Sequence, residues 1–369
     1  METSMEALLE EARSLPPIPL REISAYRTHM ADLISAVDHA MAAESDIHEL
    51  IGGNPLRTMY DNHKNHAAFM SNVFGIGHYD LLAQTVPWVY RVYRSHRFSY
   101  DYFPRELRAW MGAIRRRVTD CSMENVLAVY RWMIDAHERM IALSRSELSF
   151  DSPVDGLWLE ARNDFQAALL RGDHRRCLDI ARDRVREPGH IEPFYLHVLQ
   201  PALYEIGVLW ERCEISVAHE HIASAIVGRI MAALRTSIPL DPPEKGRAVV
   251  SASPNEFHEI GPWMISDILE LDGWDVRYVG ANTPRNDLVD LLREFRPEIL
   301  ALSVTMPFNI ENAAAVVGKI RSADDLRGLR ILVGGQTFNR NPDLWRSTGA
   351  DAFAPNLRDA RSVATAWAA

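Results

Sequence analysis

Short apolar runs that alternate with helix-length segments occupy the last third of the chain and constrain its fold most strongly. Strand, helix and next strand in this order form right-handed crossovers, so the pattern predicts a parallel, doubly wound sheet. Ligands bind such sheets at the carboxyl ends of the strands. The expected strands are residues 247–252, 275–279, 299–304, 330–333 and 352–354.

Polar residues and glycines follow three of these strands. They are Glu256, His258 and Gly261 after the first strand, Ser303 and Thr305 after the third, and Gly334 and Gly335 after the fourth. Between Gly261 and Ser303 stand 41 residues, and between Thr305 and Gly334 stand 28. This pattern and its spacing resemble the flavodoxin-like (Rossmann-type) fold that binds cobalamin in the base-off, His-on form.

The resemblance implies a role for each of these side chains. His258 would be the lower axial ligand of cobalt, with Glu256 as the carboxylate that holds its ring, a position where most members carry Asp. Ser303 and Thr305 would hydrogen-bond the cofactor's nucleotide tail. Gly334 and Gly335 would let that tail pass close to the backbone. The alternative for His258 is a helix-start histidine without a metal.

Residues 157–234 show four helical periods, which predict a four-helix bundle. Its last two helices contain Trp210 and, after nine intervening residues, Glu220 and His221. This spacing resembles the cap of light-dependent, B12-binding repressors of carotenoid synthesis, in which the Trp packs over the adenosyl group. The cofactor implied is adenosylcobalamin. The alternative is that Trp210 belongs to the bundle core and Glu220 to a solvated face.

One residue departs from the repressor pattern. The light-sensing repressors carry a His directly after the Trp, where it can ligate cobalt once the adenosyl group has left. Here that position is Glu211. His219 or His221 could replace it, or water could occupy the upper face.

Residues 18–146 carry helical periods in five or six segments, which predict an all-α domain of globin-like size. Expected helices cover residues 26–41, 56–74, 81–93, 107–118 and 126–143. Linker compositions at residues 149–156 and 237–245 divide the chain into an all-α domain (1–150), a bundle that caps the cobalamin (151–240) and the sheet domain (241–369).

A globin-like domain before a Trp-capped B12 module resembles the photocobilins, photoreceptors that pair cobalamin with biliverdin. Candidate ligands of that linear tetrapyrrole are Arg91 and Arg94 for its propionates and His63 and His66 for its pyrrole N–H groups. Haem ligation by either histidine is the alternative. A blander possibility is that the aromatic residues of this region are core and its arginines surface.

Composition excludes several classes of protein. No run of 18 apolar residues offers a membrane span, and the amino end shows no secretory signal, so we expect a cytoplasmic protein. Three scattered cysteines indicate neither disulfides nor a zinc site. A net charge of −10 argues against direct nucleic-acid binding.

The resemblance to the B12-binding repressors and the photocobilins implies a light sensor in signal transduction rather than an enzyme. We expect it to form a homo-oligomer, such as a dimer, and to act on an unknown downstream protein. The alternative is a corrinoid methyl carrier that serves a partner methyltransferase, although the bulky Trp210 argues against a methyltransferase reaching the cobalt. A mutase subunit would need a catalytic barrel for which 369 residues leave no room.

Overall fold

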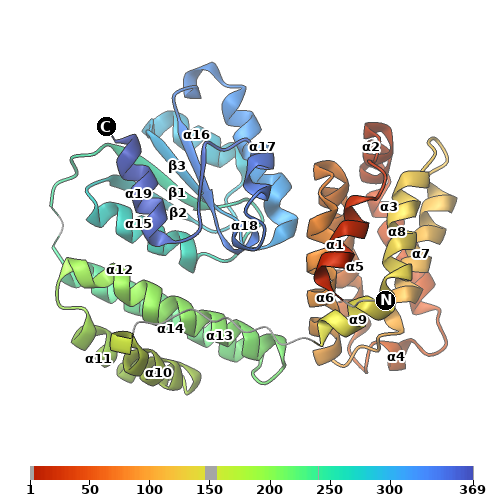
Figure 1. Ribbon diagram of the computed structural model, residues 1–369, viewed down its shortest axis with the longest axis horizontal. Coiled ribbons are helices and arrows are strands. Elements are labelled where there is room, and N and C mark those ends of the chain that lie inside the picture. The colour runs from red at the N-terminus through yellow and green to blue at the C-terminus, as the bar shows by residue number, and fades with distance from the viewer. Residues whose placement is uncertain (1–3, 146–155, 240, 369) are drawn as a thin grey trace. The chain divides into compact units, whose positions relative to one another are not determined.

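The computed structural model describes residues 4–145, 156–239 and 241–368 (Figure 1). These residues form two compact units, the first built from residues 4–145 together with 211–213 and the second from residues 156–210, 214–239 and 241–368. The boundaries expected at residues 150 and 240, and nearly all of the linker expected at 149–156, lie outside the described residues. Among the described residues, no helix is long and apolar enough to cross a membrane.

The first unit is entirely helical in its described residues, as predicted, but it has more helices than the five or six expected. They are α1 (Met5–Arg13), α2 (Leu20–Thr28), α3 (Met30–Ala42), α4 (Ile47–Leu50), α5 (Leu56–Ile76), α6 (Tyr79–Ser95), α7 (Tyr102–Arg117), α8 (Glu124–Asp135) and α9 (His137–Ser144).

Two of the expected helices are each divided by a bend of one residue. The helix expected at 26–41 breaks at His29, and the helix expected at 126–143 breaks at Ala136. In both places the backbone N–H still bonds the carbonyl four residues back, at 3.0 Å for His29 and 2.9 Å for Ala136. The apolar period therefore continues across each bend, because it reports which face is buried and not whether the axis is straight.

The four expected bundle helices begin the second unit. They are α10 (Gly156–Leu170), α11 (His174–Arg184), a long third helix and α14 (Val217–Ser237). The third helix consists of α12 (Ile191–Phe194), a π-helical turn (Tyr195–Leu199) and α13 (Gln200–Glu211).

The π-helical turn was not expected, and it stands directly before a proline. The Gln200 N–H bonds the carbonyl of Tyr195, five residues back. Pro201 has no N–H for the carbonyl four residues back, so a regular α-helix would lose a bond here. A π-turn is one way in which a helix absorbs such a local mismatch.

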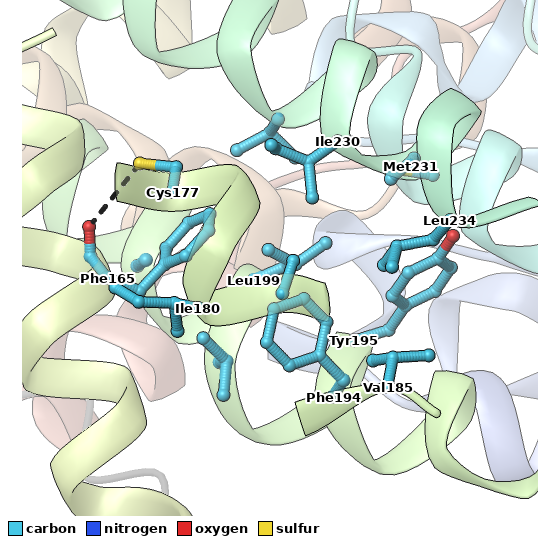
Figure 2. Close-up of a cluster of buried hydrophobic side chains, with 14 of the residues drawn as sticks. Phe165, Cys177, Ile180, Val185, Phe194, Tyr195, Leu199, Ile230, Met231 and Leu234 are labelled. Carbon is cyan, nitrogen blue, oxygen red and sulfur yellow. Dashed lines mark hydrogen bonds between the residues drawn. The ribbon is translucent and has the colours of Figure 1, made fainter. Parts of the chain in front are cut away.

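Apolar side chains from all four bundle helices form one core (Figure 2). Phe165 and Phe194 meet edge to face, with ring centroids 6.0 Å apart. Burial raises the pKa of the Cys177 thiol to about 12, so this cysteine is a packing residue and not a reactive one. Met264, Ile268 and Leu357 of the sheet domain belong to the same core, so the bundle and the sheet domain share buried surface.

The predicted sheet is confirmed. Its five parallel strands run in the order β2-β1-β3-β4-β5, the flavodoxin-like order, with the switch point between β1 and β3. The strands are β1 (Arg247–Ala252), β2 (Asp275–Gly280), β3 (Ile299–Ser303), β4 (Arg330–Gly334) and β5 (Ala352–Ala354).

Helices cover both faces of this sheet (Figure 1). Alternate residues Ala248, Val250 and Ala301 pack against one pair of helices, and the other helices lie on the opposite face. The pair is α15 (Ile260–Leu271) and α19 (Leu357–Trp367), and the others are α16 (Arg285–Phe295), α17 (Ile310–Arg321) and α18 (Gln336–Arg340).

A buried polar contact joins the bundle to the sheet domain. Tyr195 in the π-helical turn donates its hydroxyl hydrogen to Asp267 of α15 at 2.7 Å, and Asp267 is 3% exposed. Burial raises the pKa of Asp267 to about 6, far above its ordinary value, although Arg235 opposes the shift. This carboxyl group therefore binds its proton more tightly in the folded chain than in the unfolded chain.

We predict that Asp267→Asn removes a pH-dependent part of the stability. In the natural chain the contribution of Asp267 is most favourable below about pH 4 and falls as the pH rises to about 6, where the folded group has lost its proton. The variant cannot ionise, so it should gain up to about 3 kcal/mol relative to the natural chain between pH 4 and pH 7. Thermal unfolding of both proteins across this range checks the prediction, which a constant difference would contradict.

Candidate functional site

Glu256 and His258 lie in the loop between β1 and α15, at the carboxyl edge of the sheet. His258 Nδ1 is 2.5 Å from Glu256 Oε1, so the ring presents its N–H to the carboxylate and leaves Nε2 with a lone pair. The His258 side chain is 57% exposed, whereas that of Glu256 is 1% exposed. An exposed imidazole oriented by a buried carboxylate is the arrangement of a metal-binding histidine.

The Glu256 carboxylate is buried and joins two loops. Its Oε1 accepts hydrogen bonds from the backbone N–H groups of Phe257 and His258 as well as from the imidazole ring. Its Oε2 accepts from the backbone of Thr305 at 3.0 Å and of Met306 at 2.8 Å, and from Asn309 Nδ2 at 3.0 Å. Glutamate can thus replace the aspartate expected here, because the loop after β3 supplies donors for its second oxygen.

Asn309 is a site residue that the sequence analysis missed. It is fully buried, and its amide also donates to the carbonyl of Asn255 at 3.1 Å. The backbone of Asn255 has φ +65°, a left-handed conformation that asparagine tolerates. No spacing rule pointed to Asn309, since its partner stands 53 residues earlier in the chain.

When the His258 ring is protonated on both nitrogens, the charges of this pair stabilise each other. Burial acts to raise the pKa of Glu256, but the hydrogen bond and charge of His258 outweigh it, so that pKa lies below its ordinary value. Burial acts to lower the pKa of His258, yet Glu256, with a smaller contribution from Glu220, raises it. Glu220 belongs to the first turn of α14.

Ser303 and Thr305 stand where the predicted strand β3 ends. The carbonyl of Ser303 accepts the Ser253 N–H at 2.9 Å, and the carbonyl of Thr305 accepts the Thr337 hydroxyl at 2.8 Å. The backbone of both residues therefore holds the neighbouring loops together. Both residues lie at the switch point of the sheet, where the nucleotide tail of the cofactor is expected to bind.

Gly334 and Gly335 are needed by the protein backbone itself, a reason that differs from the expected passage of a ligand. A Cβ on Gly335 would lie 2.4 Å from the Val304 carbonyl oxygen, and Gly335 has φ +107°. A Cβ on Gly334 would lie 2.9 Å from the Ala354 carbonyl oxygen. Gly261 differs, because its Cβ would meet nothing within 4 Å, so neither packing nor backbone conformation requires a glycine there. Open space beside the His258 loop fits the approach of a large ligand.

Trp210, Glu220 and His221 lie at one end of the bundle. Trp210 is partly exposed and is not among the side chains of the bundle core, contrary to the alternative of an ordinary core residue. Glu220 accepts the Ser224 hydroxyl at 2.8 Å and lies 3.5 Å from His221 Nε2. The His221 side chain is 73% exposed.

The two histidines that could replace the missing one after Trp210 differ in their surroundings. His219 Nδ1 lies 2.8 Å from the Ser216 hydroxyl and completes the N-terminal cap of α14. Glu211 is the last residue of α13. The exposed His221 is therefore the histidine with the greater freedom to move.

His63 and His66 lie in a buried polar layer of the first unit, between α5 and α7. His63 is fully buried, with Nδ1 2.6 Å from Asp38 and Nε2 2.9 Å from the Tyr102 hydroxyl. His66 Nε2 lies 3.2 Å from the Tyr130 hydroxyl. Both ring nitrogens of His63 thus have partners, which argues against haem ligation by His63 in this conformation.

A series of aromatic rings in the first unit has His63 at one end and Arg91 and Arg94 at the other. Arg91 Nε donates to the Ser144 carbonyl at 2.9 Å, while the guanidinium carbon of Arg94 lies 5.6 Å from the centre of the Tyr100 ring. Arg145 lies over the same ring at 5.7 Å and is a third basic residue that the sequence analysis missed. Ring contacts connect this cluster to His63 through Tyr100, Tyr90, Phe103, Tyr93 and Tyr102.

The arrangement at His258 fits a metal held largely by a cofactor. Among the described residues, no group of three or more His, Cys, Asp or Glu side chains could hold a metal ion. A metal bound at His258 would therefore need ligands besides the side chains of the described residues. A corrin supplies four such nitrogen ligands.

Known proteins agree with this chemistry. Residues 246–361 match one family described as a B12 binding domain, and residues 161–235 match a second family of that description. The HTH-type transcriptional repressor CarH of Myxococcus xanthus is 31% identical over 174 residues, which are 47% of this chain and 57% of the repressor. The match therefore spans little more than half of that relative.

Corrinoid proteins of two Methanosarcina species are also similar to this chain. The dimethylamine corrinoid protein 3 of Methanosarcina acetivorans is 22% identical over 164 residues, 44% of this chain and 76% of that protein. The solved monomethylamine corrinoid protein of Methanosarcina barkeri aligns with 56% of this chain and 98% of its own, at 16% identity and a TM-score of 0.49. The two domain matches and these sequence relatives identify the chain as a cobalamin-binding protein.

We predict that Asn309→Ala weakens cobalamin binding by about tenfold without changing the axial ligand, because it removes a donor that fixes Glu256. His258→Ala should instead shift the absorption spectrum of the bound cobalamin and release most of it. Absorption spectra and equilibrium binding to the full chain separate the two effects. Full occupancy with an unchanged spectrum in His258→Ala would contradict the assignment of His258 as the ligand.

Proposed function

We propose that this cobalamin-binding chain is a light sensor that holds adenosylcobalamin base-off, with His258 as the lower ligand and Trp210 over the upper one. The main observation in support of this proposal is that Trp210, the largest side chain near the end of α13, does not belong to the bundle core. Glu220 of the next helix lies near enough to His258 to raise its pKa. A residue pair placed in this way can cover a ligand bound above the imidazole.

The residues of the chain have separate tasks in this proposal. When bound, adenosylcobalamin supplies a cobalt–carbon bond that visible light can break. Glu256 keeps the proton of His258 on Nδ1, so that Nε2 stays free to bind metal. Trp210 offers an apolar face to a purine, and Glu220 offers acceptors to ribose hydroxyls. When the adenosyl group leaves, Trp210 would lose the surface against which it packs. The bundle could then move relative to the sheet domain.

A methyl carrier is the second candidate, because the dimethylamine corrinoid protein 3 matches this chain over 76% of its own length. A carrier must let a partner enzyme reach the cobalt. It should therefore favour a small upper ligand and leave space above it. Trp210 favours the light sensor over the methyl carrier, since its indole ring would fill the space above the cobalt.

We predict that the full chain binds adenosylcobalamin more tightly than methylcobalamin and that Trp210→Ala reduces this preference by about tenfold, the effect of losing about 1.4 kcal/mol of ring contact. Green light should change the absorption spectrum of the adenosylcobalamin-loaded chain with no substrate or partner present. Since Trp210 lies outside the core, its replacement should cost much less than the roughly 3 to 5 kcal/mol of a buried Trp.

Trp158→Phe is the matched control, because Trp158 belongs to the bundle core and not to the site. It should lower the unfolding temperature and leave the preference between the two cobalamins unchanged. Equal affinity of the natural chain for both cobalamins, with no response to light, would support the methyl carrier instead.

We further propose that the first unit binds biliverdin. The aromatic series supplies a wall for the pyrrole rings, and Arg91, Arg94 and Arg145 at one end of it match the two propionates. His66 of the buried layer has its pKa lowered by burial, so it remains a neutral hydrogen-bonding group for pyrrole N–H groups. In the full sensor, absorption by biliverdin as a second pigment would extend the response to red light. The movement of the bundle that follows loss of the adenosyl group would alter a homodimer contact.

We predict that biliverdin added to the full chain develops a sharper red absorption band, because a rigid site restricts the flexible tetrapyrrole. Arg94→Ala with Arg145→Ala should weaken binding by about tenfold to a hundredfold through the loss of two charged partners. Arg57→Ala, a change at an arginine that is 91% exposed on α5, is the control. Tight haem binding with no response to biliverdin would replace this proposal with a haem sensor.

A further inference from the structure

The polar contacts that join the bundle to the sheet domain gather at one end of the bundle. Near Tyr195, Glu192 of α12 pairs with Arg358 at 3.1 Å and with Arg361 at 2.7 Å, both on α19. At the same end, Arg235 of α14 pairs with Glu270 of α15 at 2.9 Å. Toward Trp210, the Tyr204 hydroxyl reaches Gln336 only at 3.5 Å.

Burial distinguishes the Tyr195–Asp267 contact from its neighbours. Arg358 and Arg361 are 58% and 41% exposed, and ion pairs of exposed groups contribute little. Arg235 and Glu270, at 15% and 28% exposed, form a partly buried pair that keeps some contact with water. Tyr195 is fully buried and Asp267 almost so. Removing one partner of a buried hydrogen bond leaves the other unsatisfied, so this contact has the larger effect.

The two helices joined by this contact each lead to the cobalamin site. From Tyr195 the third bundle helix runs about 20 Å to Trp210, and from Asp267 helix α15 runs about 10 Å back to its start beside His258. A rotation of about 5° at the contact would therefore move Trp210 by about 2 Å. That distance is enough to open or close packing over a ligand on His258.

We propose that Tyr195 and Asp267 are a positioning pair. Their hydrogen bond sets the position of Trp210 over the upper face of a cobalamin bound through His258. The π-helical turn belongs to this device, because it turns the Tyr195 side chain toward α15 at the point where the third helix departs from regular α-helix. The inference rests on the proposed place of Trp210 over cobalt. Charged or titratable groups that act on Asp267 are Tyr195, Arg235, Glu270 and Tyr278.

Access to the upper face of cobalt tests the pair without using light. The full chain is loaded with hydroxocobalamin at pH 7, and the rate at which cyanide replaces the upper ligand is followed by absorption. Tyr195→Phe should raise this rate about fivefold to tenfold, the change expected from one buried hydrogen bond. Asp267→Ala should do the same, and the double variant should add little to either single change.

Two controls separate positioning from general weakening. Arg358→Ala removes an exposed contact at the same end and should change the rate less than twofold. Phe165→Leu lowers the stability of the bundle core away from the contact and should not change it. Equal acceleration in Phe165→Leu and Tyr195→Phe, at equal loss of thermal stability, would overturn the positioning role.

Trp210→Ala distinguishes this inference from the function on which it rests. It should accelerate exchange at least as much as Tyr195→Phe. If it has no effect, Trp210 does not cover cobalt, and both proposals fail. If it accelerates exchange while Tyr195→Phe and Asp267→Ala do not, the cap assignment stands and the positioning pair is wrong.

Discussion

The hydrogen bonds of one buried carboxylate hold the functional end of the sheet together. Glu256 is only 1% exposed, so its charge depends on donors from its own loop and from the loop after β3. Satisfying that charge fixes His258 at the same time, because the imidazole is one of the donors. The loop geometry, the tautomer and the exposed Nε2 therefore follow from a single electrostatic requirement.

The sheet could be predicted from the sequence because strand periods are local signals, whereas the candidate site residues came from their resemblance to a family pattern, and their roles stay predictions. Strand periods and the spacing of His258, Ser303 and Gly334 need no knowledge of contacts. Asn309 could not be found in this way, since its role depends on a partner 53 residues earlier. The same holds for Arg145, which meets Tyr100 only after α9 has packed beside α6.

The helical unit illustrates a different limit of sequence patterns. Its buried faces were predicted, but two helices break at His29 and Ala136 while their hydrogen bonds continue. Apolar periods also could not distinguish a ligand histidine from a core histidine. His63 has polar partners on both ring nitrogens inside the core, an arrangement that arises only when α5 has packed beside both α3 and α7.

Glycines at the site show how packing separates structural from ligand requirements. Gly335 cannot be replaced without moving the Val304 backbone, so its presence would be required even in a fold that bound nothing. Gly261 carries no such constraint, and a glycine near the start of a helix loses stability relative to alanine. Several other glycines, among them Gly207 and Gly318 inside helices, also meet no neighbour, so the open space at Gly261 shows only that packing does not require a glycine there.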